Sequence, residues 1–166
     1  MSGKRGAKSN PQSTAMARLT AVQALYEIEM TNTSIDNIFK DFTERRWDNN
    51  TIFDKITDDN NKLALPDKKK FTAIIRGVII NQANIIRILN KAASENIYFD
   101  KLDSLIKSIL LCATYEICFE NLTPNKVVLN EYINITKAFY EQNESSLVNG
   151  VLDRIAKMYD KKICKI

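Results

Sequence analysis

Apolar side chains recur every three or four residues along most of this 166-residue chain, which is the spacing typical of amphipathic α-helices. The first such stretch covers about residues 14–31. Its large apolar members are Leu19, Val22, Leu25 and Ile28. Ser34 is placed to cap a second helix that runs to about Trp47. The Asn- and Asp-rich residues 48–65 then predict a long loop, which separates these two helices from the rest.

The second half of the chain predicts four more helices. Pro66 suits the first position of the third helix, whose apolar rhythm continues to about Leu89. The β-branched run at 78–81 could form a strand on its own, but its neighbours keep the helical phase. Gly77 in this helix and Gly150 in the last helix both predict points where two helices pack closely. The remaining helices are expected at about residues 101–120, 124–140 and 144–160.

Turn residues are scarce in this chain. Four glycines and three prolines are too few for a sandwich, a barrel or a doubly wound sheet. Thr123 and Pro124 predict the N-cap and the first position of the fifth helix. We therefore predict an all-α protein whose six helices form one domain over residues 14–160. A disordered basic arm at 1–13 and a basic tail at 161–166 flank it.

The composition excludes several classes of site. The chain has no histidine, which rules out His-based catalytic triads, His zinc sites and His proton relays. Its three cysteines, Cys112, Cys118 and Cys164, have no C-x-x-C spacing and no export signal before them, which predicts reduced thiols in the cytoplasm. No uninterrupted apolar run reaches 18 residues. We expect no metal, no cofactor and no membrane span.

Catalytic patterns are missing as well. The four glycines are scattered and form no phosphate-binding loop. Ser145 and Ser146 have no histidine to activate them, and Asp100 and Asp103 are explained by the start of a helix. We therefore expect a binding protein and not an enzyme.

The net charge of +4 is unevenly distributed. Residues 1–18 carry Lys4, Arg5, Lys8 and Arg18 with no acid, residues 154–166 carry five basic residues against one acid, and residues 19–153 carry 15 against 19. The two ends are thus +4 each and the middle is −4. An acid-free basic arm can neutralise phosphates, so RNA binding that weakens with salt is the leading functional expectation.

Three segments make this expectation specific. They are AVQALYEIE at 21–29, ATYEICFENLTPNKVVLNEYINITKAF at 113–139 and LVNGVLDRIA at 147–156. In this order and spacing they resemble the NusB family of bacterial transcription antitermination factors over about residues 14–158. The resemblance implies an all-α NusB-like domain of two packed three-helix halves. It also implies binding of the boxA element of ribosomal RNA leader transcripts as a heterodimer with NusE, a small-subunit ribosomal protein. This complex helps RNA polymerase read through terminators, without cofactor or catalysis.

The resemblance also points to individual RNA-binding residues. They are Arg18, which matches the arginine just before the AVQALY motif, Lys126, Lys137 and Asn149, in addition to the arm residues Lys4, Arg5 and Lys8. Lys137 could equally be solvated helix surface and Asn149 could be structural, as we expect for the pair Asn130 and Glu131. Asn143 and Leu147 replace the family's usual aspartate and aromatic residue, so this stretch offers no ring for base stacking.

For NusE, the resemblance implies contact through Tyr26 and the neighbouring Glu29. Alternatively, Tyr26 has a structural role and packs at the edge of the core. Three other roles stay open: an adaptor that binds NusE but has lost specific RNA recognition, a homodimer formed through the same surface, and the detached regulatory domain of an rRNA methyltransferase. The chain has no segment for the methyltransferase itself, so we expect a free-standing factor.

Overall fold

The computed structural model describes residues 11–46, 65–120 and 122–159, and every regular element in these ranges is helical. The elements are α1 (Pro11–Thr31), α2 (Ile35–Lys40), the π-helix η1 (Asp41–Arg46), α4 (Lys68–Ala92), the 3-10 helix η2 (Phe99–Lys101), α5 (Ser104–Cys118), α6 (Asn125–Phe139) and α7 (Gln142–Met158). The predicted all-α fold with six α-helices is confirmed, and the β-branched run at 78–81 is helical.

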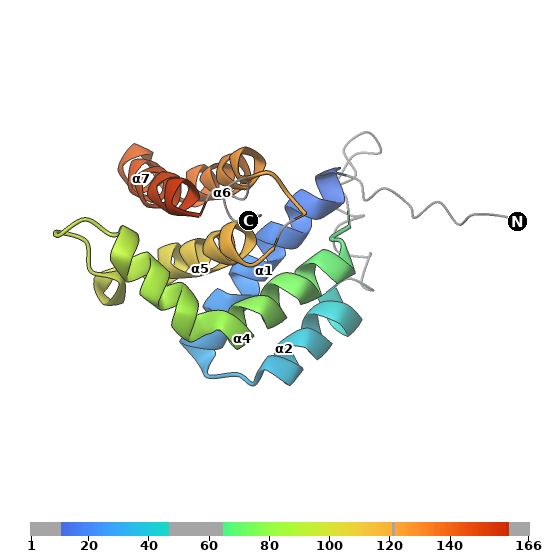
Figure 1. Ribbon diagram of the computed structural model, residues 1–166. Helices are drawn as coiled ribbons and strands as arrows, with labels where there is room; N and C mark the ends of the chain where they lie inside the picture. The colour runs from blue at the N-terminus through green and yellow to red at the C-terminus, as the bar shows by residue number, and fades with distance from the viewer. Residues whose placement is uncertain (1–10, 47–64, 121, 160–166) are drawn as a thin grey trace, which may run out of the picture.

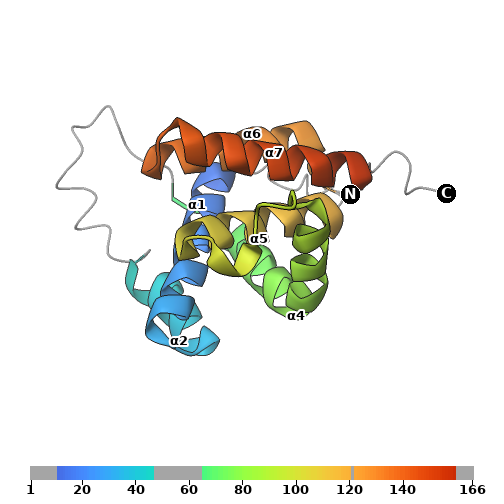
Figure 2. The ribbon, with the colours of Figure 1, turned by 90° about the vertical axis from the view of Figure 1, so that its left-hand side faces the viewer.

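Helix α5 lies at the centre of the molecule (Figure 1). It packs against α1 and α4 on one side and against α6 and α7 on the other. Figure 2 shows the same separation, with α6 and α7 together above α5 and with α2 and α4 below it. This arrangement corresponds to two three-helix halves, α1, α2 and α4 in one and α5, α6 and α7 in the other. The apolar stripes predicted from the sequence meet in a continuous core.

Three helices have an N-cap side chain that accepts a backbone hydrogen bond, which is Ser34 for α2, Asp67 for α4 and Asp103 for α5. Ser34 caps α2, as predicted, because its hydroxyl accepts a hydrogen bond from the backbone N–H of Asn37 at 3.2 Å. The prediction for Pro66 was wrong by two positions: Asp67 caps α4 by accepting from the N–H groups of Lys69 and Lys70. Pro66 therefore lies just outside the helix.

The starts of the other helices also differ from the prediction. Pro124, and not Thr123, occupies the N-cap position of α6, because its backbone is still extended there. Helix α1 begins at Pro11, so residues 11–13 are helical and do not belong to an arm. A hydrogen bond from the N–H of Asp67 to the carbonyl of Ser13, at 3.0 Å, joins this first turn to the start of α4. The rest of the predicted arm, most of the loop at 48–65 and the basic tail lie outside the described residues.

The two helical glycines differ. A Cβ atom added at Gly77 would lie 2.1 Å from the ring of Tyr115, so α4 and α5 can approach only because this side chain is missing. The predicted close contact at Gly77 is confirmed. Gly150 is exposed, and a Cβ there would meet nothing within 4 Å, so the same prediction for Gly150 was wrong.

Helix α4 is long and apolar enough, by length and composition alone, to cross a membrane. In this fold its apolar side packs against α1 and α5, where Phe71, Ile74, Ile75, Val78 and Ile85 are buried. A core helix of this kind satisfies the same test without any membrane.

Candidate nucleic-acid interface

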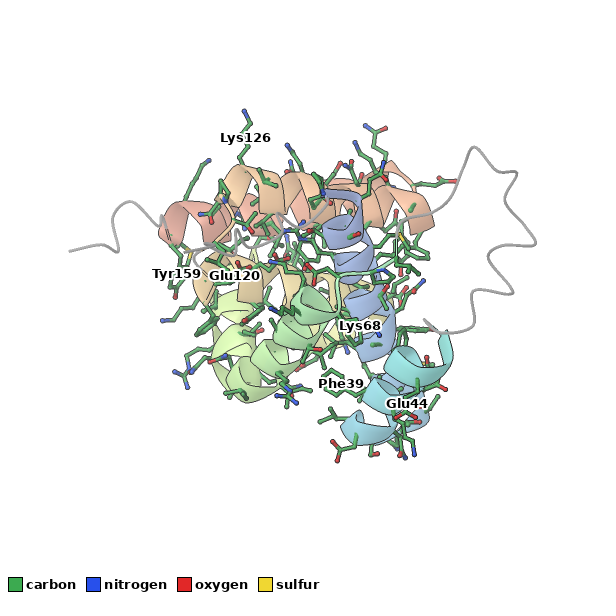
Figure 3. The ribbon with its side chains drawn as sticks, turned by 90° about the vertical axis from the view of Figure 1, so that its right-hand side faces the viewer. Phe39, Glu44, Lys68, Glu120, Lys126 and Tyr159 are labelled. Atoms are coloured by element: carbon green, nitrogen blue, oxygen red, sulfur yellow. The ribbon has the colours of Figure 1, made fainter. Side chains whose placement is uncertain are left out.

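Two of the predicted RNA-binding lysines lie on one exposed face of α6. Lys126 is in its first turn and Lys137 in its last, and both side chains are exposed. They are eleven positions apart, so they are separated by about 16 Å along the axis and by about 20° around it. Figure 3 shows Lys126 pointing away from the protein. The helix thus presents two positive charges in one line to a polyanion.

The segment that joins α6 to α7 surrounds a surface depression of about 440 Å³. The residues that line it are Lys137, Ala138, Phe139, Tyr140, Glu141, Asn143 and Glu144. Phe139 is 45% exposed, so an aromatic ring is available at this end of α6 after all. As expected, residues 143–147 contain no aromatic side chain for base stacking. The fold nevertheless places Phe139 at the same depression as Asn143. Asn149, another predicted contact, is exposed on α7, which packs against α6.

A side-chain hydrogen bond fixes the position of this segment. The Tyr140 hydroxyl donates to Asp103 Oδ2, and Asp103 also caps α5 through the N–H of Leu105. Burial and this hydrogen bond raise the pKa of Tyr140, so the phenol stays protonated and keeps donating at neutral pH. The depression is therefore anchored to the central helix.

Arg18 is not on the surface. Arg18 is only 3% exposed, and its guanidinium forms a bidentate ion pair with Glu116. The Nε–Oε2 distance is 2.9 Å and the Nη2–Oε1 distance is 3.0 Å. Glu131 adds a second carboxylate at 3.8 Å from Nη1. A guanidinium held in this way cannot reach a phosphate, so the expectation that Arg18 contacts RNA is corrected. Lys4, Arg5 and Lys8 lie outside the described residues.

Glu116 collects partners from three other helices. Besides Arg18 of α1, Lys70 of α4 lies with its Nζ 2.6 Å from Oε1, and the hydroxyl of Tyr132 on α6 donates to Oε2 at 2.5 Å. Burial by itself would raise the pKa of Glu116, but the hydrogen bond and charge of Arg18 and the charge of Lys70 outweigh it and lower that pKa. The carboxylate is therefore ionised at neutral pH and holds four helices together.

The same cluster reaches the turn that leads into α6. Lys70 Nζ also pairs with Glu120 at 2.7 Å, and the other oxygen of Glu120 accepts from the N–H of Leu122 at 3.2 Å. Leu122 lies three residues before the start of α6. The buried charges thus help to place the end of α6 that carries Lys126.

Sequence reasoning missed Glu116 and Lys70. The available signal was Glu116 itself, the one carboxylate of the most apolar helix, because a charged side chain on an apolar helix needs a partner when it is buried. Arg18, which has the apolar and small residues 15–17 before it, was a suitable partner. The pairing itself could not be read from positions 98 residues apart.

The residues expected to meet a protein partner lie on the last turns of α1. Tyr26 is 36% exposed, and Met30, one turn later, is 59% exposed. Glu29 accepts a hydrogen bond from the Ser104 hydroxyl at 3.2 Å and lies 3.9 Å from the Nζ of Lys107. This end of α1 is a surface with an aromatic ring, a thioether and a carboxylate, which is suited to a basic partner with apolar anchors.

The amino-acid sequence is similar to those of known proteins. The NusB family profile matches residues 15–157 of the chain. The transcription antitermination protein NusB of Caulobacter vibrioides is 34% identical over 146 residues, which cover 88% of this chain and 93% of that protein. The protein of the same name from Sinorhizobium fredii is 35% identical over 141 residues, or 85% of this chain and 84% of its own.

Solved structures show the same fold. T. maritima NusB has a TM-score of 0.68 and 26% identity, and the match covers 96% of this chain and 100% of that one. A chain in the crystal structure of antitermination factors NusB and NusE in complex with dsRNA has a TM-score of 0.70 and 19% identity, covering 90% and 100%. At that identity the second likeness concerns the fold alone.

Proposed function

Since this chain belongs to the NusB family, we propose that it is a transcription antitermination factor that binds boxA-type RNA of ribosomal RNA leaders jointly with NusE. It acts in the cytoplasm, within the complex that lets RNA polymerase read through terminators. Its role is binding and not catalysis. The observation that carries the proposal is the pair of exposed lysines on α6, Lys126 and Lys137, in a chain that the family matches from residue 15 to 157.

The RNA lies across α6 and the start of α7 in this proposal. Lys126 and Lys137 neutralise phosphates, which positions the strand without selecting its sequence. Phe139 provides a face on which a base can stack, and Asn143 and Asn149 have amides that can hydrogen-bond base edges. Selectivity for boxA therefore depends on the α6–α7 segment.

The protein partner occupies the neighbouring surface at the end of α1 in this proposal. Tyr26, Met30 and Glu29 at the end of α1 form the proposed contact with NusE. The partly exposed ring of Tyr26 and the exposed side chain of Met30 can be buried on association, while Glu29 attracts a basic protein. RNA and NusE can then be bound at the same time.

The test of RNA binding compares a boxA RNA with a scrambled RNA, with and without NusE, at two salt concentrations. We expect a preference for boxA that NusE strengthens. Changing Lys126 and Lys137 together to Gln should lower the affinity for RNA and reduce the slope of log affinity against log salt by about 1.4, since each phosphate contact of a single strand contributes about 0.7. Equal affinity for both RNAs in the presence of NusE would contradict the proposal.

A matched variant controls for net charge. Lys101 and Lys157 are also exposed, but they lie on η2 and at the end of α7. Changing both to Gln removes the same charge and should leave the preference for boxA and the salt slope close to wild type. Phe139→Leu keeps an apolar side chain without the aromatic face, so it should reduce the discrimination between the two RNAs more than the salt slope.

The test of the NusE contact uses two tyrosines. Tyr26→Asp should abolish NusE binding, because it places a charge where an apolar contact is proposed, while the chain keeps its fold. Tyr98→Asp is the control, since Tyr98 is 62% exposed and lies in another part of the sequence, at the N-cap of η2. NusE binding that survives Tyr26→Asp would remove Tyr26 from the proposed contact.

The rival function is an adaptor that binds NusE and has no sequence-specific contact with RNA. The burial of Arg18 favours it, because one expected RNA contact is lost to the core. It predicts full NusE binding with equal affinity for boxA and scrambled RNA. Sedimentation of the protein alone and with NusE tests the homodimer: a dimer that uses the Tyr26 surface dissociates when NusE is added.

A further inference from the structure

Helix α4 differs in charge from every other described helix. Over Lys68–Ala92 it contains six basic residues and no acidic one. Helices α1, α2, α5, α6 and α7 each contain both signs. Exposed helices usually mix charges, which favours intrahelical pairs and solubility, so a 25-residue helix of one sign needs a reason of its own.

Four of these basic residues share one side of the helix. Lys69, Arg76, Arg87 and Lys91 are all exposed, and their spacing places them within about 60° of one another around the helix, which bends near its middle (Figures 1 and 2). We call them the basic stripe. In the part of the chain that the structure describes, no carboxylate forms an ion pair with any of the four. Lys70, by contrast, points inward to Glu116 and Glu120 and does not belong to the stripe.

The residues between the charges are small or carry amides. Ala73, Ala83, Asn84 and Asn90 are exposed along the stripe, and Ile80, 79% exposed, is its only large apolar residue. A helix that lies in a lipid surface needs several large apolar residues beside its basic face, which the stripe lacks. Amides and small residues between cations suit a polynucleotide backbone, because they leave room for the strand and can hydrogen-bond to it.

One member of the stripe is already oriented. The guanidinium of Arg76 lies over the ring of Phe39 on α2, with Cζ 5.8 Å from the ring centroid. A stacked guanidinium keeps its N–H groups available at its edge and loses less conformational freedom when it binds a phosphate.

The stripe is separate from the α6 surface. Helix α5 lies between α4 and α6, so the two helices carry their exposed faces on different sides of the central helix (Figures 1 and 3). A strand that passes over Lys126 and Lys137 therefore has to leave that surface before it reaches α4.

From these observations we propose that the basic stripe is a second, sequence-independent RNA-binding surface, which holds the phosphate backbone of nucleotides that flank the boxA element. The inference rests on the proposed function, since it assumes that RNA is the ligand. A strand held at both α6 and α4 wraps the protein, and the second contact adds affinity by raising the effective concentration of the flanking nucleotides near the stripe.

The experiment uses the full chain with NusE and two RNAs, one holding only the boxA element and one extended by flanking nucleotides on both sides. The stripe variant changes Arg76, Arg87 and Lys91 to Gln. Its control changes Lys40, Lys101 and Lys157 to Gln, which removes the same charge from exposed positions outside α4. All six substitutions are at exposed positions, and circular dichroism checks that both variants keep the fold.

We expect the wild type and the control to bind the extended RNA more tightly than the short one. The stripe variant should lose this gain, about tenfold in affinity, and its salt slope on the extended RNA should fall by about two. Its affinity for the short RNA should stay that of the wild type. If the flanking nucleotides increase the affinity of the stripe variant as much as that of the wild type, the proposal is overturned.

Two further outcomes separate this inference from its rivals. If the short RNA binds no better than a scrambled one, the proposed function fails, whereas specific binding of the short RNA with no gain from the flanks overturns only the second surface. Vesicles that contain phosphatidylserine test the lipid alternative. A stripe variant that lowers vesicle binding and leaves RNA binding intact would assign the stripe to a membrane surface instead.

Discussion

Arg18 and Glu116, 98 positions apart, form a two-pronged buried ion pair that joins α1 to the central helix. Lys70 and the hydroxyl of Tyr132 complete the shell of the carboxylate, so four helices meet at one charge. A paired and hydrogen-bonded charge of this kind is costly to disrupt by removing one partner, because the others remain buried without compensation. The cluster therefore makes the packing of the two halves depend on Glu116.

Glu116→Gln should destabilise the protein by about 3–5 kcal/mol, since it leaves the cations of Arg18 and Lys70 without their buried counter-charge. Urea unfolding followed by circular dichroism measures this free energy. Glu29→Gln is the control, because Glu29 is more exposed and lies 3.9 Å from Lys107, so its removal should cost at most about 1 kcal/mol. Equal costs for the two substitutions would show that the buried cluster contributes nothing special.

The lowered pKa of Glu116 predicts how stability depends on pH. A carboxyl whose folded pKa is below its unfolded value of 4.5 contributes stability that is fully present above that value and is lost as the pH falls through the folded pKa. The wild type should therefore lose more free energy of unfolding below about pH 5 than Glu116→Gln does. Parallel acid dependences for the two proteins would contradict the assignment.

Gly77 and Tyr115 should show a coupled response. Gly77→Ala places a Cβ against the Tyr115 ring, which has to move, and we expect a net loss of about 1–2 kcal/mol. In a Tyr115→Ala background the same change meets no ring and should stabilise the helix by up to about 1 kcal/mol. A double-mutant cycle by thermal or urea unfolding checks the reversal of sign.

Gly150→Ala should stabilise the protein by about 0.5–1 kcal/mol. The position is exposed and helical with no neighbour within 4 Å of the added Cβ, so alanine gains helix propensity at no packing cost. A loss of stability on this substitution would mean that the backbone at residue 150 approaches another group. Together with Gly77, it tests whether the two glycines have different roles.

The helices and the family could be predicted from the residues alone. Apolar spacing depends only on the period of the helix, so the six α-helices, their inward faces and the helical state of residues 78–81 could all be predicted. The segments at 21–29, 113–139 and 147–156 identified the family, and with it the exposed Lys126 and Lys137. Helix starts were less well predicted, because Asp67 and Pro124 compete locally with neighbours that suit the same position.

Which charges are buried depends on how the helices pack against one another. Arg18 has the composition of a surface residue in a basic segment, and it is buried because Glu116 lies opposite it across α1 and α5. Conversely, the acidic middle of the sequence concealed the basic stripe on α4, since summing charge along the chain mixes residues that the fold places on different faces. Burial and charge grouping depend on contacts between distant segments, and those contacts form only when the helices pack.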